Sequence, residues 1–197
     1  MEIKKLEDFI KCIPESLSGN IPVARHLYLE LGKRSFYDPE YKYNIFGEEE
    51  LEYINKPYSN PNIIICTTLV KQYNRLLNMA NIPNNISADV SGHYFNVFED
   101  EEGQEHETDI TQDLKNIQFG CKTNYFGINS ISQEDLRELD KVLGYIPEGR
   151  GYSDEYWYII KDAISNERLT AQQRLELIFN NLHRLGDPQK PRNYRTI

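Results

Sequence analysis

The spacing of apolar residues changes from a helical to a strand-like period near the middle of the chain. Over 66–80, apolar and small side chains fall on one helical face, and Pro83 follows the end of that pattern. Beyond Pro83, apolar and polar residues alternate in short runs, at 85–90, 93–99 and 106–111. The expected structure is a helix followed by a small antiparallel sheet, in which the last two runs form a hairpin.

Helical patterns also flank this central part of the chain. Helices are expected over 3–13 and over 20–32, before the pattern described above. After the sheet, helices are expected over 132–143, from Ser153 and from Thr170. This order of helices, a small antiparallel sheet and further helices predicts an α+β fold.

Length and composition favour one domain that does not enter a membrane. The 197 residues can bury a core without disulfides, and we expect a single domain over 1–186 with a flexible tail over 187–197. No stretch approaches the roughly 20 apolar residues of a membrane span. The first residues, MEIKKLEDFIKCI, lack the apolar region of a secretory signal. A cytoplasmic protein, or one exported without a classical signal peptide, is therefore expected, with no membrane partner.

Charge and cysteine content narrow the classes of function. The net charge of −9 argues against nucleic acid as a partner, because phosphate backbones are bound by cationic surfaces. The three cysteines, at positions 12, 66 and 121, are odd in number and widely spaced, which fits a reduced compartment better than a disulfide framework. No CxxC or HxxxH pair is present, so neither a metal ion nor another cofactor is expected.

Cys66, His93 and Asp109 follow one another in an order that nucleophilic catalysis can use. Cys66 opens the central helix, where unpaired N–H groups and the helix dipole favour a thiolate. His93 opens a strand and could accept the thiol proton, while Asp109 on the next strand could orient the imidazole. The N–H groups at the helix start could also bind the oxyanion of a tetrahedral intermediate.

The predicted hairpin brings the imidazole and the carboxylate within reach of each other. With the turn centred near Glu101–Glu102, Asp109 lies opposite His93 or one diagonal step away, on the same face of the sheet. A register slip of one residue would move the two side chains to opposite faces. The proposed contact therefore depends on the register of the hairpin.

Simpler interpretations exist for each of these residues. A cysteine after an isoleucine run is usually a small core residue, and a histidine in a strand is usually exposed or already hydrogen-bonded. An aspartate near a strand end usually serves a turn, and zinc binding would require a fourth ligand. The other histidines, His26, His106 and His183, are expected to face solvent. The other cysteines, Cys12 and Cys121, lack a candidate basic partner for catalysis.

Five short segments occur in a characteristic order between residues 22 and 115. They are SFYD, the helical segment CTTLVKQYNRLLNMA, the turn ANIP, the strand GHYFNV and the strand TDIT. In sequence and order these segments resemble the transglutaminase-like branch of the papain-like cysteine peptidase superfamily. The resemblance implies a papain-like core over about 22–115, with 132–186 as a helical extension.

The resemblance also implies roles for particular residues. Cys66, His93 and Asp109 match the catalytic triad of that family, which attacks an amide and forms a thioester. The loop before the nucleophile offers candidate side chains for the oxyanion site, at Tyr58, Asn60 and Asn62. The implied partner is a protein or peptide substrate.

The sequence leaves several alternatives open. If water accepts the acyl group the reaction is proteolysis or deamidation, and if an amine accepts it the reaction is transglutamination; a hydrolase is favoured. Acetyl transfer through the same triad, as in arylamine acetyltransferases, is a weaker alternative. A non-catalytic protein-binding module that retains the fold is the alternative from another class. The sequence does not indicate the oligomeric state.

Overall fold

The computed structural model describes residues 3–37, 57–59, 62–118 and 120–147, together with the isolated positions 168, 169, 173 and 177. The helices in these ranges are α1 (Leu6–Ile10), α2 (Asn20–Gly32), α4 (Cys66–Met79), α5 (Ile110–Gln118) and α6 (Gln133–Val142). The strands are β1 (Ser35–Tyr37), β2 (Asn62–Ile64), β3 (Asn84–Ala88), β4 (Tyr94–Glu99), β5 (Glu105–Thr108) and β6 (Phe126–Ile128). The described part of the chain is an α+β fold, as the sequence predicts.

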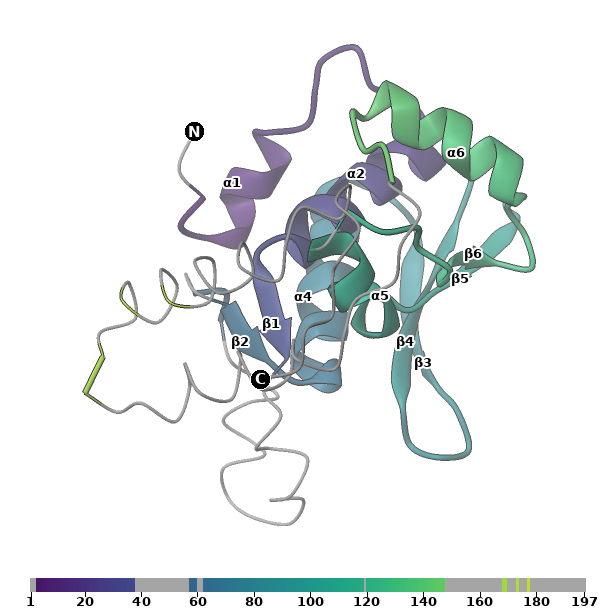
Figure 1. Cartoon of the computed structure of the whole chain (residues 1–197). Coiled ribbons are helices and arrows are strands. Elements are labelled where there is room, and N and C mark those ends of the chain that lie inside the picture. The colour runs from purple at the N-terminus through teal and green to yellow at the C-terminus, as the bar shows by residue number, and fades with distance from the viewer. Residues whose placement is uncertain are drawn as a thin grey trace, which may run out of the picture.

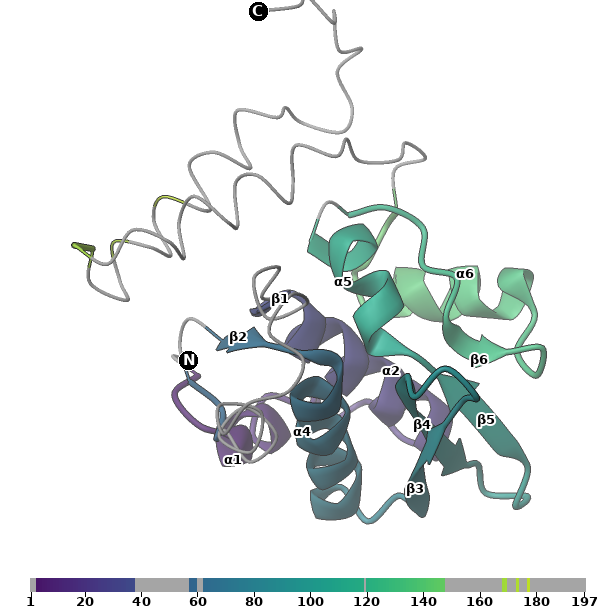
Figure 2. The same cartoon turned by 90° about the horizontal axis from the view of Figure 1, so that it is seen from below.

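Two separate sheets lie on either side of a group of helices. Strands β3, β4, β5 and β6 form an antiparallel sheet in that order, and β1 pairs in parallel with β2. Figure 1 shows α2, α4 and α5 between the two sheets, and α6 beyond them near β6. Figure 2 shows the same arrangement from below, with α4 between β2 and β3. The start of α4 and the start of β4 therefore belong to adjacent elements.

One face of α4 forms the centre of the hydrophobic core. Leu69, Tyr73, Leu76 and Leu77 are fully buried, at the helical spacing that the sequence predicts. They pack in a single cluster with apolar residues of α1, α2, α5 and the larger sheet. Because the core is closely packed, it fixes the first residue of α4 relative to the sheet.

A buried ion pair joins α2 to α6. Both oxygens of Asp140 accept hydrogen bonds from Arg25, from Nε and from one terminal nitrogen, each at 2.8 Å. The same terminal nitrogen donates to Thr123 Oγ1 at 2.7 Å. The side chains of Arg25 and Asp140 are 0% and 4% exposed, and aromatic rings surround the guanidinium. Such a bidentate pair is specific in geometry, and leaving either partner alone in the core is costly.

The strand expected over 106–111 is shorter than predicted and leads into a helix. Strand β5 ends at Thr108, and Ile110 begins α5, so the alternating run is split between two elements. Asp109 lies at the junction, where its Oδ1 accepts a hydrogen bond from the N–H of Thr111 at 3.0 Å. This side chain caps α5, because it satisfies an N–H group that the first helical turn leaves unpaired.

Two further differences concern the N-terminal part of the chain. The helix expected over 3–13 is limited to α1, and Pro14 disfavours a helical conformation in the residue before it. The pairing of β1 with β2 was not predicted, because it joins segments that are far apart in the sequence. The helices expected from Ser153 and Thr170, apart from isolated positions, and the tail over 187–197 lie outside the described residues.

The prediction that His106 faces solvent is wrong. Its side chain is 2% exposed, with Nδ1 2.8 Å from Ser130 Oγ and Nε2 3.0 Å from Asp100 Oδ2. The other oxygen of Asp100 accepts backbone N–H groups in the turn between β4 and β5. His106 therefore ties that turn to the loop after β6. His26 is half-buried, and His183 lies outside the described residues.

Among the helices in the described ranges, none is both long enough and apolar enough to cross a bilayer.

We expect Asp140→Asn to lower the free energy of unfolding by about 3 kcal/mol or more, because it leaves the Arg25 guanidinium buried without its counter-charge. Urea unfolding followed by circular dichroism measures the change. Glu138→Gln on the same helix is the matched control, because Glu138 pairs with Lys141 on an open surface and should matter little. Equal, small effects of the two substitutions would contradict the assigned role of the buried pair.

Candidate active site

Cys66 is the first residue of α4 and follows β2 after a single residue. The N-cap residue is Ile65, which makes no side-chain hydrogen bond to the helix. The N–H groups of a first helical turn have no intrahelical partner, so they and the helix dipole favour negative charge at this end. Cys66 is partly exposed, whereas Cys121 is buried. Cys66 therefore combines partial exposure with a position at the positive end of a helix.

His93 directly precedes β4 and is held in place by the loop before it. The Oδ1 atom of Asp89 accepts the backbone N–H groups of Ser91 and His93, at 2.8 and 3.0 Å. The N–H of Asp89 in turn donates to the carbonyl of His93 at 2.9 Å. Gly92 has a φ of +80°, a conformation that glycine adopts without steric cost. This turn fixes the backbone from which the imidazole extends.

Asp109 uses both carboxylate oxygens. Oδ2 lies 2.5 Å from Nε2 of His93, and Oδ1 accepts the N–H groups of Thr111 and Gln112, at 3.0 and 3.3 Å. The side chain is 8% exposed. A short contact between a carboxylate and an imidazole in a largely buried position is a strong, charge-assisted hydrogen bond. The residue that caps α5 is thus also the residue that orients His93.

The hairpin register places these two residues as the sequence predicts. Asn96 pairs with Thr108 and Val97 with Glu107. Continuing this register outward sets position 95 opposite Asp109, so Asp109 is one diagonal step from His93 on the same face. Diagonal neighbours in an antiparallel pair are within reach of each other. The contact is made at the open end of the hairpin, just beyond the last paired residues.

Cys66 lies beside the imidazole of His93 and, like Asp109, favours its protonated form. Because Nε2 faces Asp109, Nδ1 is the nitrogen left for the sulfur. The bond to Asp109 and then the bond to Cys66 raise the pKa of His93 to about 10, against the opposing effect of burial. The structure therefore brings Cys66, His93 and Asp109 together in the order that the sequence indicates.

The three side chains suggested for an oxyanion site are placed differently. Tyr58 is buried with its ring against Phe9, at a centroid distance of 5.1 Å, and burial raises its pKa to about 12. The Nδ2 group of Asn62 donates to Ser35 Oγ and Gln72 Oε1, at 2.7 and 2.8 Å, so its two hydrogens are already used. Asn60 lies outside the described residues. The backbone N–H groups at the start of α4 remain as candidate donors for an oxyanion.

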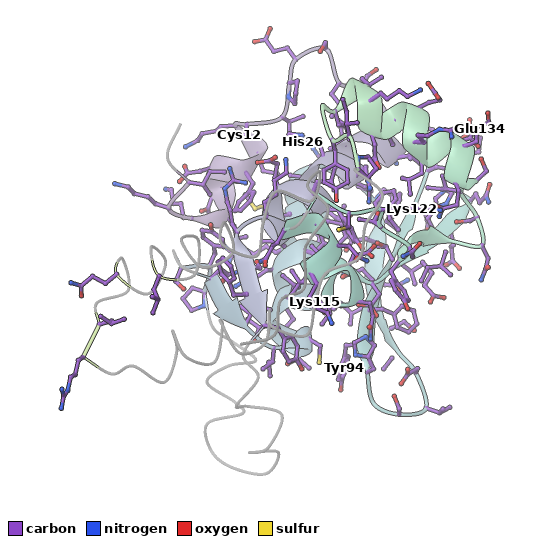
Figure 3. The ribbon with its side chains drawn as sticks, in the orientation of Figure 1. Cys12, His26, Tyr94, Lys115, Lys122 and Glu134 are labelled. Carbon is purple, nitrogen blue, oxygen red and sulfur yellow. The ribbon has the colours of Figure 1, made fainter. Side chains whose placement is uncertain are left out.

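The surface next to His93 carries exposed apolar side chains. The β3–β4 hairpin contributes Ile86 and Tyr94, which are 37% and 39% exposed, and Val90 at its turn is fully exposed. Figure 1 shows this hairpin extending beyond the rest of the described fold. Figure 3 shows Tyr94 at this end of the molecule and Cys12 at the other. Exposed apolar side chains therefore lie beside the candidate site, and Cys12 is remote from it.

Two positioning features were not predicted from the sequence. Asp89 shapes the turn before His93, and the Asp-x-Ser-Gly pattern of that turn is a recognisable signal for such a side chain. The capping role of Asp109 is the second, and its signal is an aspartate directly before a helical run. Within the described ranges, no cluster of three or more His, Cys, Asp or Glu side chains is arranged to hold a metal ion.

Comparison with known proteins does not assign the chain to a family. No protein-family model matches it, and no curated protein and no solved structure is significantly similar to it. A function must therefore be inferred from the geometry of the site.

We predict that the His93 ring titrates with a pKa near 10, and not near the 6.5 of a free histidine. Its protonated form stabilises the fold fully below about pH 6.5. That stabilisation is lost as the pH rises through about 10. NMR of the ring carbon-bound protons between pH 5 and about 11 measures this directly, within the range where the fold persists.

Two substitutions separate the contributions of Asp109 and Cys66 to the raised pKa of His93. Asp109→Asn should lower the pKa of His93 more than Cys66→Ala does, because the bond to Asp109 is the larger contribution. A wild-type midpoint near 6.5, or no change in Asp109→Asn, would contradict the hydrogen-bonded arrangement.

Proposed function

We propose that the protein is a cysteine-dependent enzyme that transfers the acyl group of an amide through a Cys-His-Asp triad. The observation that carries the proposal is the position of His93, whose imidazole is hydrogen-bonded to Asp109 and interacts with Cys66. Its support from the sequence is the resemblance to the transglutaminase-like branch of the papain-like superfamily. A nucleophile, a base and a group that orients the base are the three parts that such a reaction needs.

In the proposed mechanism, Cys66 and His93 rest as a thiolate–imidazolium pair, with the thiol proton on Nδ1 of His93. The thiolate attacks the carbonyl carbon of the substrate, and the N–H groups at the start of α4 stabilise the oxyanion of the tetrahedral intermediate. His93 then gives the proton to the departing nitrogen, so that ammonia or an amine leaves and a thioester to Cys66 remains. Asp109 keeps the imidazole in the required orientation throughout.

The second half of the reaction returns the enzyme to its starting state. His93 removes a proton from an acceptor, which attacks the thioester carbonyl, and the thiolate of Cys66 leaves and is paired with the imidazolium. Water as acceptor gives hydrolysis of a peptide bond or deamidation of a side-chain amide, and an amine gives a new amide. We favour hydrolysis of a protein or peptide amide, and the exposed apolar hairpin beside His93 suits a macromolecular substrate.

The proposal predicts that Cys66 reacts selectively with a limiting amount of iodoacetamide at pH 6. At this pH an ordinary thiol is almost entirely protonated and reacts slowly, whereas a thiol paired with an imidazole is ionised. Peptide mass spectrometry should show Cys66 labelled at least about tenfold faster than Cys12, an internal control that lies outside the site. His93→Ala should remove the difference. Equal labelling of both cysteines would favour the alternative of a non-catalytic binding module.

A second experiment identifies the acceptor of the acyl group. A denatured, glutamine-containing protein is incubated with the enzyme, with and without an added primary amine. New amino termini indicate proteolysis, release of ammonia alone indicates deamidation, and incorporation of the amine indicates transamidation. Cys66→Ser should reduce each signal by about 10³-fold or more, since loss of one triad member disables the whole unit. Turnover that persists in Cys66→Ser would rule out the thioester mechanism.

A further inference from the structure

Asp113 is a carboxylate buried in the core close to the candidate site. It lies in the first turn of α5 and is 0% exposed. Its oxygens accept hydrogen bonds from the Tyr28 hydroxyl at 2.7 Å, Asn116 Nδ2 at 2.9 Å, and the N–H groups of Asn124 and Tyr125, at 3.0 and 2.9 Å. Burial raises the pKa of Asp113, while these hydrogen bonds oppose that effect. A buried carboxylate with this many donors organises the backbone around it.

Two of the groups that Asp113 binds, Tyr28 and Tyr125, also hold the backbone of Asp109. The Tyr28 hydroxyl lies 3.1 Å from the carbonyl oxygen of Asp109, as well as next to Asp113. The N–H of Asp109 donates to the carbonyl of Tyr125 at 2.7 Å, and the N–H of Tyr125 is bound by Asp113. The N–H and the carbonyl group of Asp109 are therefore both held by residues that Asp113 itself binds.

Tyr28 connects this arrangement to the rigid core. Its ring is fully buried and makes edge contacts with Tyr73 and Phe126, at centroid distances of 5.8 and 5.2 Å. A side chain packed on several sides cannot rotate to follow Asp109, so its hydroxyl defines one position for the Asp109 carbonyl. The carboxylate of Asp109 has to stay within hydrogen-bonding distance of His93, and catalytic geometry of this kind tolerates little displacement.

We propose that Tyr28 and Asp113 are a positioning pair that holds Asp109 in the orientation in which it binds His93. This inference rests on the function proposed above, and it concerns two residues that contact neither Cys66 nor His93. They act through Asp109 only, by fixing its backbone from the core side while its side chain caps α5 and orients the imidazole.

The test compares Tyr28→Phe with Tyr73→Phe. Both tyrosines are fully buried, and each hydroxyl lies within hydrogen-bonding distance of a backbone carbonyl, that of Tyr28 at 3.1 Å from Asp109 and that of Tyr73 at 2.9 Å from Ala24. Each substitution deletes one buried hydroxyl from the same cluster, so both variants should show similar, modest falls in melting temperature. Tyr28 alone contacts Asp109 and Asp113, so the difference between the variants isolates positioning from stability.

Two readouts are measured in wild type and in both variants. In Tyr28→Phe, the labelling rate of Cys66 with iodoacetamide at pH 6 should fall by roughly tenfold or more, and the NMR pKa of His93 should move toward 6.5. In Tyr73→Phe both should stay at the wild-type values. Asp113→Asn, which removes an acceptor shared by four residues, should have a larger effect on both readouts. If the Asp113→Asn variant does not fold, Tyr28→Phe still tests the positioning role.

The outcomes separate this inference from the proposed function. If wild type shows fast labelling of Cys66 and a raised His93 pKa, but Tyr28→Phe behaves like Tyr73→Phe, the positioning role is wrong and the triad stands. If wild-type Cys66 labels no faster than Cys12 and His93 titrates near 6.5, the proposed function fails and the inference fails with it. A selective loss in Tyr28→Phe supports both.

Discussion

The hydrogen bond between His93 Nε2 and Asp109 Oδ2 is the contact on which the rest of the site depends. At 2.5 Å, it joins the start of β4 to the start of α5. It forms only if the β4–β5 register is correct, since a slip of one residue would turn the two side chains to opposite faces. Once it has formed, only Nδ1 of the imidazole is left to face α4 and Cys66. This contact therefore fixes the orientation of the His93 imidazole and joins the end of the β4–β5 pair to the start of α5.

The starts of α4, α5 and α6 differ in how their unpaired N–H groups are satisfied. At α5, Asp109 accepts two of them with its side chain, and at α6 the Ser132 hydroxyl accepts the N–H of Asp135. At α4 the N-cap residue is Ile65, which provides no side-chain acceptor. Ile65 therefore offers no side-chain acceptor that would compete with a thiolate or an oxyanion for the positive end of this helix.

The parts of the fold that could be predicted are those whose signals are local. The helix beginning at Cys66 follows from the spacing of its apolar residues. The hairpin register follows from a turn that Asp100 closes through nearby N–H groups. The diagonal contact of His93 with Asp109 follows from that register, so most of the candidate site could be predicted from the sequence. The short α5 could not, because Ile110 and Thr111 continue the alternating pattern of β5 and only the capping by Asp109 ends it.

Contacts between distant segments could not be predicted from the sequence. The parallel pairing of β1 with β2 joins segments that show no mutual signal. His106 is buried because of its contacts with Asp100 and Ser130, and the latter lies 24 residues further on. The sequence indicates no hydrogen-bond partner for Asn62, but its amide group donates to Ser35 Oγ and Gln72 Oε1. In each case the partner lies in another segment of the chain, so no local sequence pattern indicates it.

The most direct test of the central claim is a crystal structure of the protein after reaction with a peptide aldehyde, which thiolates attack to form a tetrahedral adduct. The account predicts a bond to the Cys66 sulfur, the adduct oxygen against the N–H groups at the start of α4, and His93 still held by Asp109. An unreacted Cys66, or an adduct whose oxygen points away from that helix start with His93 displaced from Asp109, would contradict it.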